Sequence, residues 1–255
     1  MSQHGKNYRG ARAQIDREQL YSPAEAIRML KSFPAAKFDE TVELHLNLGL
    51  NVRHAEQQLR GTLMLPHGTG RESRVAVFAE GEKAREAQEA GADVVGTADL
   101  AKQIEEGFDD FDVAVATPDL MGTVGKLGRI LGPRGKMPNP KTGTVTFDVA
   151  KAVQESKAGK LEYRTDRGAN IHLIIGKKSF DERALLENYA TLIEEIVRAK
   201  PSAAKGRYIR TITLTTTMGP GVHVDTTRTR GITEELDGES AGADSPTRED
   251  ATVTA

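Results

Sequence analysis

The sequence predicts a two-domain α/β protein, in which a Rossmann-like βαβ domain is inserted into a split α+β domain. Residues 40–50 and 209–218 both alternate apolar and polar side chains, which is typical of strands in an open sheet with one buried face. Between them, residues 75–117 hold three short apolar runs that begin about 20 residues apart, the spacing of parallel strands joined by helices. The length of 255 residues also suits two domains.

The charge distribution follows the same division. We expect a discontinuous domain of residues 1–67 plus 160–230, an inserted domain of residues 68–159, and a disordered acidic tail of residues 231–255, which has few apolar residues. Their net charges are +7, −3 and −6, which together give the chain's −2. The basic domain favours a polyanionic partner, although ordinary solvated surfaces also carry an excess of this size.

The first domain opens with a basic segment, expected to be mobile, up to about Gln19. Ser22, Pro23 and Glu25 then form a helix start with an N-cap, a proline in the first turn and a capping box, and the helix should end near Ser32. Strands are predicted at 40–50 and 59–65. In the first of these, one face carries only apolar residues: Val42, Leu44, Leu46, Leu48 and Leu50.

The inserted domain should contain strands at 75–79, 93–96, 113–117 and 144–147, with helices between them. Residues 121–131 fit a helical face and lead into a loop rich in Gly, Pro and Lys at 132–143, and a last helix follows at 149–158. Glycines mark both connections to the first domain, which favours a hinge, although two tight turns are the alternative. These glycines are Gly68, Gly70 and Gly159.

The chain then returns to the first domain with strands at 160–164 and 170–175. Residues 179–182 form a second capping box ahead of a long helix, whose apolar stripe from Leu185 to Val197 is read as core. In the final strand, one face is predicted to hold Ile212, Leu214, Thr216 and Met218, before a Gly-Pro-Gly turn at 219–221.

Composition limits the possible sites and locations. No cysteine is present, which excludes disulfides and thiolate metal sites and fits a reducing cytoplasm. No apolar run approaches the roughly 18 residues of a membrane helix, so no membrane partner is expected. The six histidines lack metal-ligand spacing, so no metal site is expected, and His45 and His172 on strand faces are read as solvated or hydrogen-bonded.

Three enzyme-like motifs fail on context. The Gly-x-Ser-x-Gly match at 238–242 lies in the acidic tail with no strand before it. Gly125-Lys126 and Gly135-Lys136 are not followed by the Ser or Thr of a phosphate loop. The turn at 79–82 places two carboxylates where a dinucleotide needs glycines, so no cofactor and no catalytic residues are expected.

RNA binding is the function class that remains. Residues 217–221 offer a hydroxyl, exposed N–H groups and a thioether at a sheet end, which suit RNA sugars, phosphates and base faces, although a plain Pro-Gly turn would have the same pattern. With five Tyr, seven Phe and no Trp, the chain lacks a broad aromatic platform. Recognition of folded RNA shape is therefore expected.

Five segments resemble the bacterial large-subunit ribosomal protein L-one family: KFDETVELHLNLGLNVR, GTLMLPHGTG, LGRILGPRGKMPNPKTGTV, EYRTDRGANIHLIIGKKSF and TLTTTMGPG. The resemblance covers about residues 3–228. It implies a non-enzymatic, cytoplasmic protein of the ribosome, monomeric when free, that binds large-subunit rRNA at a mobile stalk. It also implies assistance in releasing deacylated tRNA from the exit site and repression of the mRNA of its own operon.

By this resemblance, the rRNA surface would contain Phe38, Thr41, Thr217, Met218, Gly219, Pro220 and Gly221. Arg53, Arg164, His172 and Lys177 are expected as neighbours from their charge and position, or as solvated residues. Arg129, Arg134 and Lys136 would face tRNA, unless their loop packs against its own domain. The acidic tail departs from the family's short ending and would compete for the basic face.

Two other functions are also compatible with the sequence. A Rossmann-like nucleotide-binding enzyme would be favoured by a nucleotide that raises the melting temperature. A protein-only interaction module would bind with little dependence on salt, whereas RNA binding gives a steep salt slope.

Overall fold

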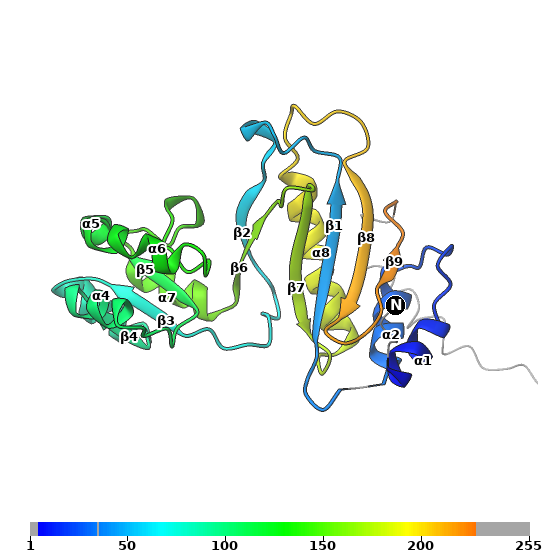
Figure 1. Cartoon of the computed structure of the whole chain (residues 1–255), viewed down its shortest axis with the longest axis horizontal. Coiled ribbons are helices and arrows are strands. Elements are labelled where there is room, and N and C mark those ends of the chain that lie inside the picture. The colour runs from blue at the N-terminus through cyan, green and yellow to red at the C-terminus, as the bar shows by residue number, and fades with distance from the viewer. Residues whose placement is uncertain (1–4, 35, 228–255) are drawn as a thin grey trace, which may run out of the picture.

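The computed structural model describes residues 5–34 and 36–227, so the predicted acidic tail and the motif at 238–242 lie outside the described residues. The chain forms an α/β protein with two groups of elements (Figure 1). The larger group is made from both ends of the described chain, and the smaller group is made from its middle. The fold class is therefore as predicted.

The larger group is built on an antiparallel four-stranded sheet with strand order β7-β1-β8-β9. Its strands are β1 (Thr41–Leu48), β7 (Asn170–Lys177), β8 (Ile209–Thr216) and β9 (Val222–Val224). Helices α2 (Pro23–Ser32) and α8 (Glu182–Arg198) cover one face (Figure 1). The other face is left open, as the alternating strands predicted.

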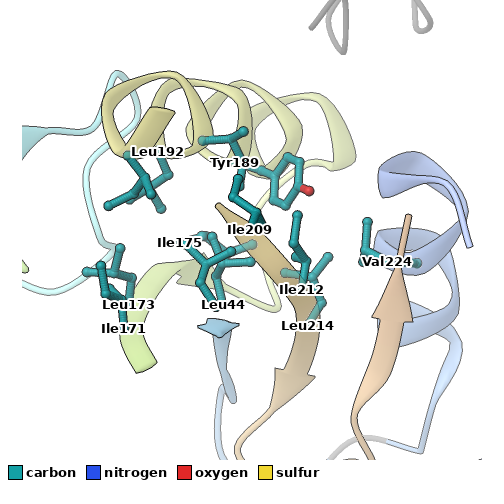
Figure 2. Packing of buried hydrophobic residues seen from close by; sticks show 14 of the residues in the cluster. Leu44, Ile171, Leu173, Ile175, Tyr189, Leu192, Ile209, Ile212, Leu214 and Val224 are labelled. Atoms are coloured by element: carbon teal, nitrogen blue, oxygen red, sulfur yellow. The ribbon is translucent and has the colours of Figure 1, made fainter. Parts of the chain in front are cut away.

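The apolar side chains of these strands meet α8 in one core (Figure 2). Leu44, Ile212 and Leu214 are buried, and Tyr189 of α8 lies over the sheet beside them. The helix start at Ser22 is confirmed, since its side chain accepts from the Glu25 amide and Glu25 accepts from the Ser22 amide. The amphipathic pattern of the helices therefore decides which of their faces packs on the sheet, and the capping box fixes where α2 begins.

A two-stranded antiparallel ribbon leads from this core toward the smaller group. It pairs β2 (Arg60–Met64) with β6 (Lys160–Arg164). The short 3-10 turn η1 (Ala55–Gln57) precedes β2.

The smaller group is a parallel sheet with order β4-β3-β5, as the repeat spacing predicted. Apolar clusters lie on both of its faces, one with α4 and the segment 120–131, the other with α3 and α7. The elements are β3 (Val75–Phe78), α3 (Glu82–Glu89), β4 (Val94–Gly96), α4 (Ala98–Glu105), β5 (Val113–Ala116) and α7 (Val149–Lys157).

Two predictions for this smaller group are wrong. The helix expected over 121–131 is broken into short turns, because glycines at 122, 125 and 128 weaken a continuous helix: η2 (Pro118–Leu120), α5 (Met121–Val124), η3 (Gly125–Leu127) and α6 (Gly128–Leu131). The strand expected at 144–147 is a single bridge from Val145 to Ala116 after η4 (Pro140–Thr142).

Two elements of the larger group were not predicted, and one prediction for it is wrong. The basic N-terminal segment, for which no helix was predicted, contains α1 (Lys6–Ala13), which buries only Ala11 and so left little apolar pattern. Strand β9 was not predicted. The capping box at 179–182 is absent, because α8 starts after Asp181 and the Ser179 side chain instead donates to Asp39.

Candidate RNA interface

One end of the open sheet is a cluster of three chain segments, which we call the turn cluster: residues 36–41, 177–180 and 216–221. Thr41 and Thr217 join two of them, since the Thr41 amide donates to Thr217 Oγ1 at 3.0 Å and the Thr217 amide donates to the Thr41 carbonyl at 3.1 Å. Lys177 Nζ adds a bond to Thr41 Oγ1 at 2.9 Å. The strand ends are therefore fixed relative to one another.

Glu40 is a buried side chain that joins two segments of the turn cluster. It is 2% exposed and accepts from the amides of Ala36 and Met218 at 2.8 and 3.3 Å. Burial alone would raise the pKa of this carboxyl, but the neighbouring Thr216 hydroxyl, these two amides and the Lys178 ammonium favour the charged form, so the pKa is lowered. A buried carboxylate thus holds both turns in place.

Two large apolar side chains are exposed on this cluster. Phe38 is 54% exposed and Met218 is 61% exposed. The prediction that Met218 shares the buried face with Leu214 is wrong, because β8 ends at Thr216 and the chain turns there. Exposed apolar side chains amid hydroxyls and amides are what unstacked bases and sugars contact.

The turn that follows Met218 needs its small residues. A Cβ on Gly219 would clash with Thr216 Oγ1, and one on Gly221 would lie 2.9 Å from Thr213 Cγ2. Pro220 is buried between them. Glycine is therefore required at positions 219 and 221 for structural reasons, whether or not the turn also contacts a partner.

Arg53 and Arg164 lie away from the turn cluster, so they are not its neighbours as predicted. They line a cavity of about 720 Å³ at the other end of the sheet. Strands of eight residues separate the two ends by about 25 Å. We call this second surface the arginine cluster; its lining is Val52, Arg53, Gln58, Arg164, Thr165, Asp166 and Arg167.

His172 lies between these two surfaces, on the open face of the sheet, and pairs with His45 across strands β7 and β1. Their Nδ1 atoms are 2.8 Å apart. Burial and the charge of His172 lower the pKa of His45, against an opposing effect of Glu43. Both rings were expected to be solvated or hydrogen-bonded, but their pairing was not predicted, because it depends on the register of the two strands.

The three cations expected to face tRNA differ in their surroundings. Arg129 is exposed on α6. Arg134 Nη1 lies 2.9 Å from Asp109 Oδ2, and Lys136 Nζ donates to Asp109 Oδ1 at 2.7 Å and to the Phe111 carbonyl. The Lys136 side chain is only 18% exposed, so this residue packs against its own domain, which was the alternative.

The glycines at the two connections all have positive φ: Gly68 at +64°, Gly70 at +71° and Gly159 at +95°. The connections lie side by side, since a Cβ on Gly159 would be 3.0 Å from the Gly68 Cα. The buried Asn188 side chain donates to the carbonyls of Gly68 and Ile175 and accepts from the His67 amide. The outgoing connection is therefore tied to α8 as far as Gly68.

The described residues show neither a membrane-spanning helix nor a cluster of metal ligands. None of the helices found in residues 5–34 and 36–227 is long and apolar enough to cross a membrane. Within the same ranges, no three or more metal-ligating side chains come together.

A family model described as "Ribosomal protein L1p/L10e family" matches residues 30–220, which includes both connections and all of the turn cluster except Gly221. The chain belongs to this family of ribosomal proteins. The family is non-enzymatic, so the chain has no catalytic role and is located in the ribosome of the cytoplasm.

Similar curated proteins match over nearly their whole length. The large ribosomal subunit protein uL1 of Thermobifida fusca is 63% identical over 225 residues, covering 88% of this chain and 96% of the relative. The protein of the same name from Rubrobacter xylanophilus is 63% identical over 222 residues, with 87% and 96% covered. That of Beutenbergia cavernae is 57% identical over 235 residues, with 92% and 99% covered.

Proposed function

We propose that this chain is a protein of the large ribosomal subunit that binds folded rRNA at a mobile stalk through the turn cluster. The observation that carries the proposal is the pair of exposed apolar side chains, Phe38 and Met218, on backbone fixed by the Thr41–Thr217 bonds and by Glu40. A rigid surface with stacking groups and exposed amides recognises RNA shape without a large ordering cost.

The arginine cluster extends this surface along the phosphate backbone. Arg53, Arg164 and Arg167 line the same hollow, and only Asp166 opposes them there. These arginines lie about 25 Å from the turn cluster. An RNA that contacts both surfaces would therefore have to lie along the length of the sheet, and contact with the turn cluster alone would not reach the arginines. His172 lies between the two clusters and Lys177 lies within the turn cluster, and both belong to the proposed RNA surface.

The same surface supports repression of the chain's own operon. An mRNA segment that folds like the rRNA site would meet the same apolar pair and the same arginines, and excess free protein, proposed to be monomeric, would then bind the message. A leader mRNA that competes with the rRNA fragment for one site supports this role, and simultaneous binding of both RNAs contradicts it.

The inserted domain is proposed to contact tRNA and assist its release from the exit site. Arg129 is its best-placed cation, because Arg134 and Lys136 are paired with Asp109. We place the domain boundaries at residues 67/68 and 159/160, with Gly68, Gly70 and Gly159 as the hinge. Since Asn188 ties Gly68 to α8, bending of the outgoing connection is expected at and after Gly70.

The deciding experiment is binding of the purified chain to a stalk rRNA fragment across a salt series, beside a scrambled RNA of equal length. Selective binding with a steep log-log salt slope supports the proposal, because several phosphates are neutralised. Equal and weak binding to both RNAs contradicts it and favours a protein partner.

A further inference from the structure

The open face of the main sheet carries a row of side chains that crosses all four strands. His172 of β7 is paired with His45 of β1, His45 with Thr213 of β8, and Thr213 with His223 of β9. All four side chains alternate with buried neighbours and therefore lie on the face opposite the helices. Three of the chain's six histidines thus share one level of the sheet.

The first two members of the row converge on a single point. Nδ1 of His45 and Nδ1 of His172 are 2.8 Å apart, with the ring planes at 64° to each other. Two imidazole nitrogens that bind one tetrahedral Zn²⁺ at 2.0–2.1 Å are separated by about 3.3 Å. A displacement of either ring by about half an ångström would therefore bring the two Nδ1 atoms to the separation that a shared Zn²⁺ requires.

The other nitrogen of each ring faces a carboxylate. His45 Nε2 lies 3.5 Å from Glu43 Oε2, and His172 Nε2 lies 3.6 Å from Asp166 Oδ2. Metal-binding histidines usually place their second ring nitrogen against a carboxylate or carbonyl, which orients the ring and strengthens it as a ligand. Each ring thus has a carboxylate near its second nitrogen, at a distance slightly longer than a hydrogen bond.

The local charge differs along the row. Glu43 and Asp166 flank the His45–His172 pair, whereas His223 lines a hollow of about 420 Å³ together with Arg12 and Arg17. A cation is therefore favoured at the pair and disfavoured at His223. Both paired side chains are solvent-accessible, so an ion can enter and water can complete its coordination.

We propose that His45 and His172 form a two-histidine site for a divalent transition-metal ion of the kind that prefers imidazole, such as Zn²⁺. On binding, the ring that carries its hydrogen on Nδ1 changes tautomer: this hydrogen leaves to solvent as a proton, and the ring takes up a proton at Nε2. Both rings then stay neutral, and each Nδ1 donates its lone pair to the ion. The expectation of no metal site rested on spacing along the chain, which does not detect ligands supplied by two paired strands.

The test is a calorimetric titration of the full chain with Zn²⁺ after treatment with a chelator. One equivalent should bind, and the ring-nitrogen NMR signals of His45 and His172 should shift at Nδ1. His45→Asn and His172→Asn should each lower the affinity by more than about tenfold, and Glu43→Gln by about tenfold, because it removes the carboxylate behind one ligand. His54→Asn, in an exposed loop, is the matched control and should bind as the unmodified chain does.

Unchanged melting curves of the exposed-face variants show that they remain folded. The proposal is overturned if the chain binds no Zn²⁺, if His45→Asn and His172→Asn bind as tightly as the control, or if the NMR shifts appear on other histidines. The first result would mean that the pair binds no metal ion, and either of the other two would mean an adventitious ion only.

Discussion

Thr41 and Thr217 are separated by 176 residues, yet each donates its amide to the other, one to a side-chain oxygen at 3.0 Å and one to a carbonyl at 3.1 Å. This contact joins the start of β1 to the turn after β8. Lys177 Nζ adds a third chain segment through Thr41 Oγ1. The exposed Phe38 and Met218 side chains consequently lie on a backbone that is ordered before any RNA arrives.

Removal of the Thr217 hydroxyl should loosen this arrangement. Thr217→Val keeps the volume but leaves the Thr41 amide without its acceptor, so we expect the free energy of unfolding to fall by about 0.5–1.5 kcal/mol and affinity for the rRNA fragment to fall several-fold. Thr211→Val, at an exposed position of β8, is the control. Denaturant melts and RNA titrations measure both effects, and equal behaviour of the two variants would argue against a positioning role.

The apolar pair should carry selective binding. Met218→Asp places a negative charge against phosphates and should abolish selective rRNA binding in a folded chain, while Phe38→Ala should cost about 1–3 kcal/mol if Phe38 stacks on a base. Met64→Asp is the matched control, since Met64 is 46% exposed on β2, away from the turn cluster. Undiminished affinity in folded Met218→Asp would remove the turn cluster from the RNA interface.

The arginine cluster should act through phosphates and not through sequence. Arg53→Ala and Arg164→Ala should weaken binding to related RNAs about equally and should each reduce the log-log salt slope by about 1. Arg198→Ala, which removes a cation of α8 that is paired with Glu195, should leave the slope unchanged. A salt slope that stays the same in both cluster variants would show that the RNA does not reach this end of the sheet.

The buried and exposed faces of the sheet were predictable because alternation is local: Leu44 and Ile212 are buried as the pattern indicated. Positions that depend on where a strand ends or which strand pairs with which were not. Met218 lies past the end of β8, and the His45–His172 pair depends on the register of β1 and β7. The separation of Arg53 from the turn cluster, by contrast, could have been predicted, because Arg53 follows the end of the strand that begins at Thr41.

Glu40 should make the turn cluster sensitive to acid. Its folded-state pKa is lower than its usual value near 4.5, so the carboxylate contributes stability that is fully present above the unfolded pKa and is lost as pH falls through the folded pKa. Unfolding free energy should therefore decline below about pH 4.5. Glu40→Gln should flatten this part of the pH profile measured by denaturant melts; an unaltered profile would assign the acid sensitivity to other carboxyls.

The side-by-side connections should tolerate no side chain at Gly159. Its φ of +95° disfavours other residues, and a Cβ would meet the Gly68 backbone at 3.0 Å, so Gly159→Ala should combine strain with a clash and lower unfolding free energy by more than about 1–2 kcal/mol. Gly107→Ala is the control, because Gly107 has φ +112° but open space around it, so strain alone acts there. Small-angle scattering should show a changed domain arrangement for Gly159→Ala only, and identical losses in both variants would mean that the contact between connections contributes nothing.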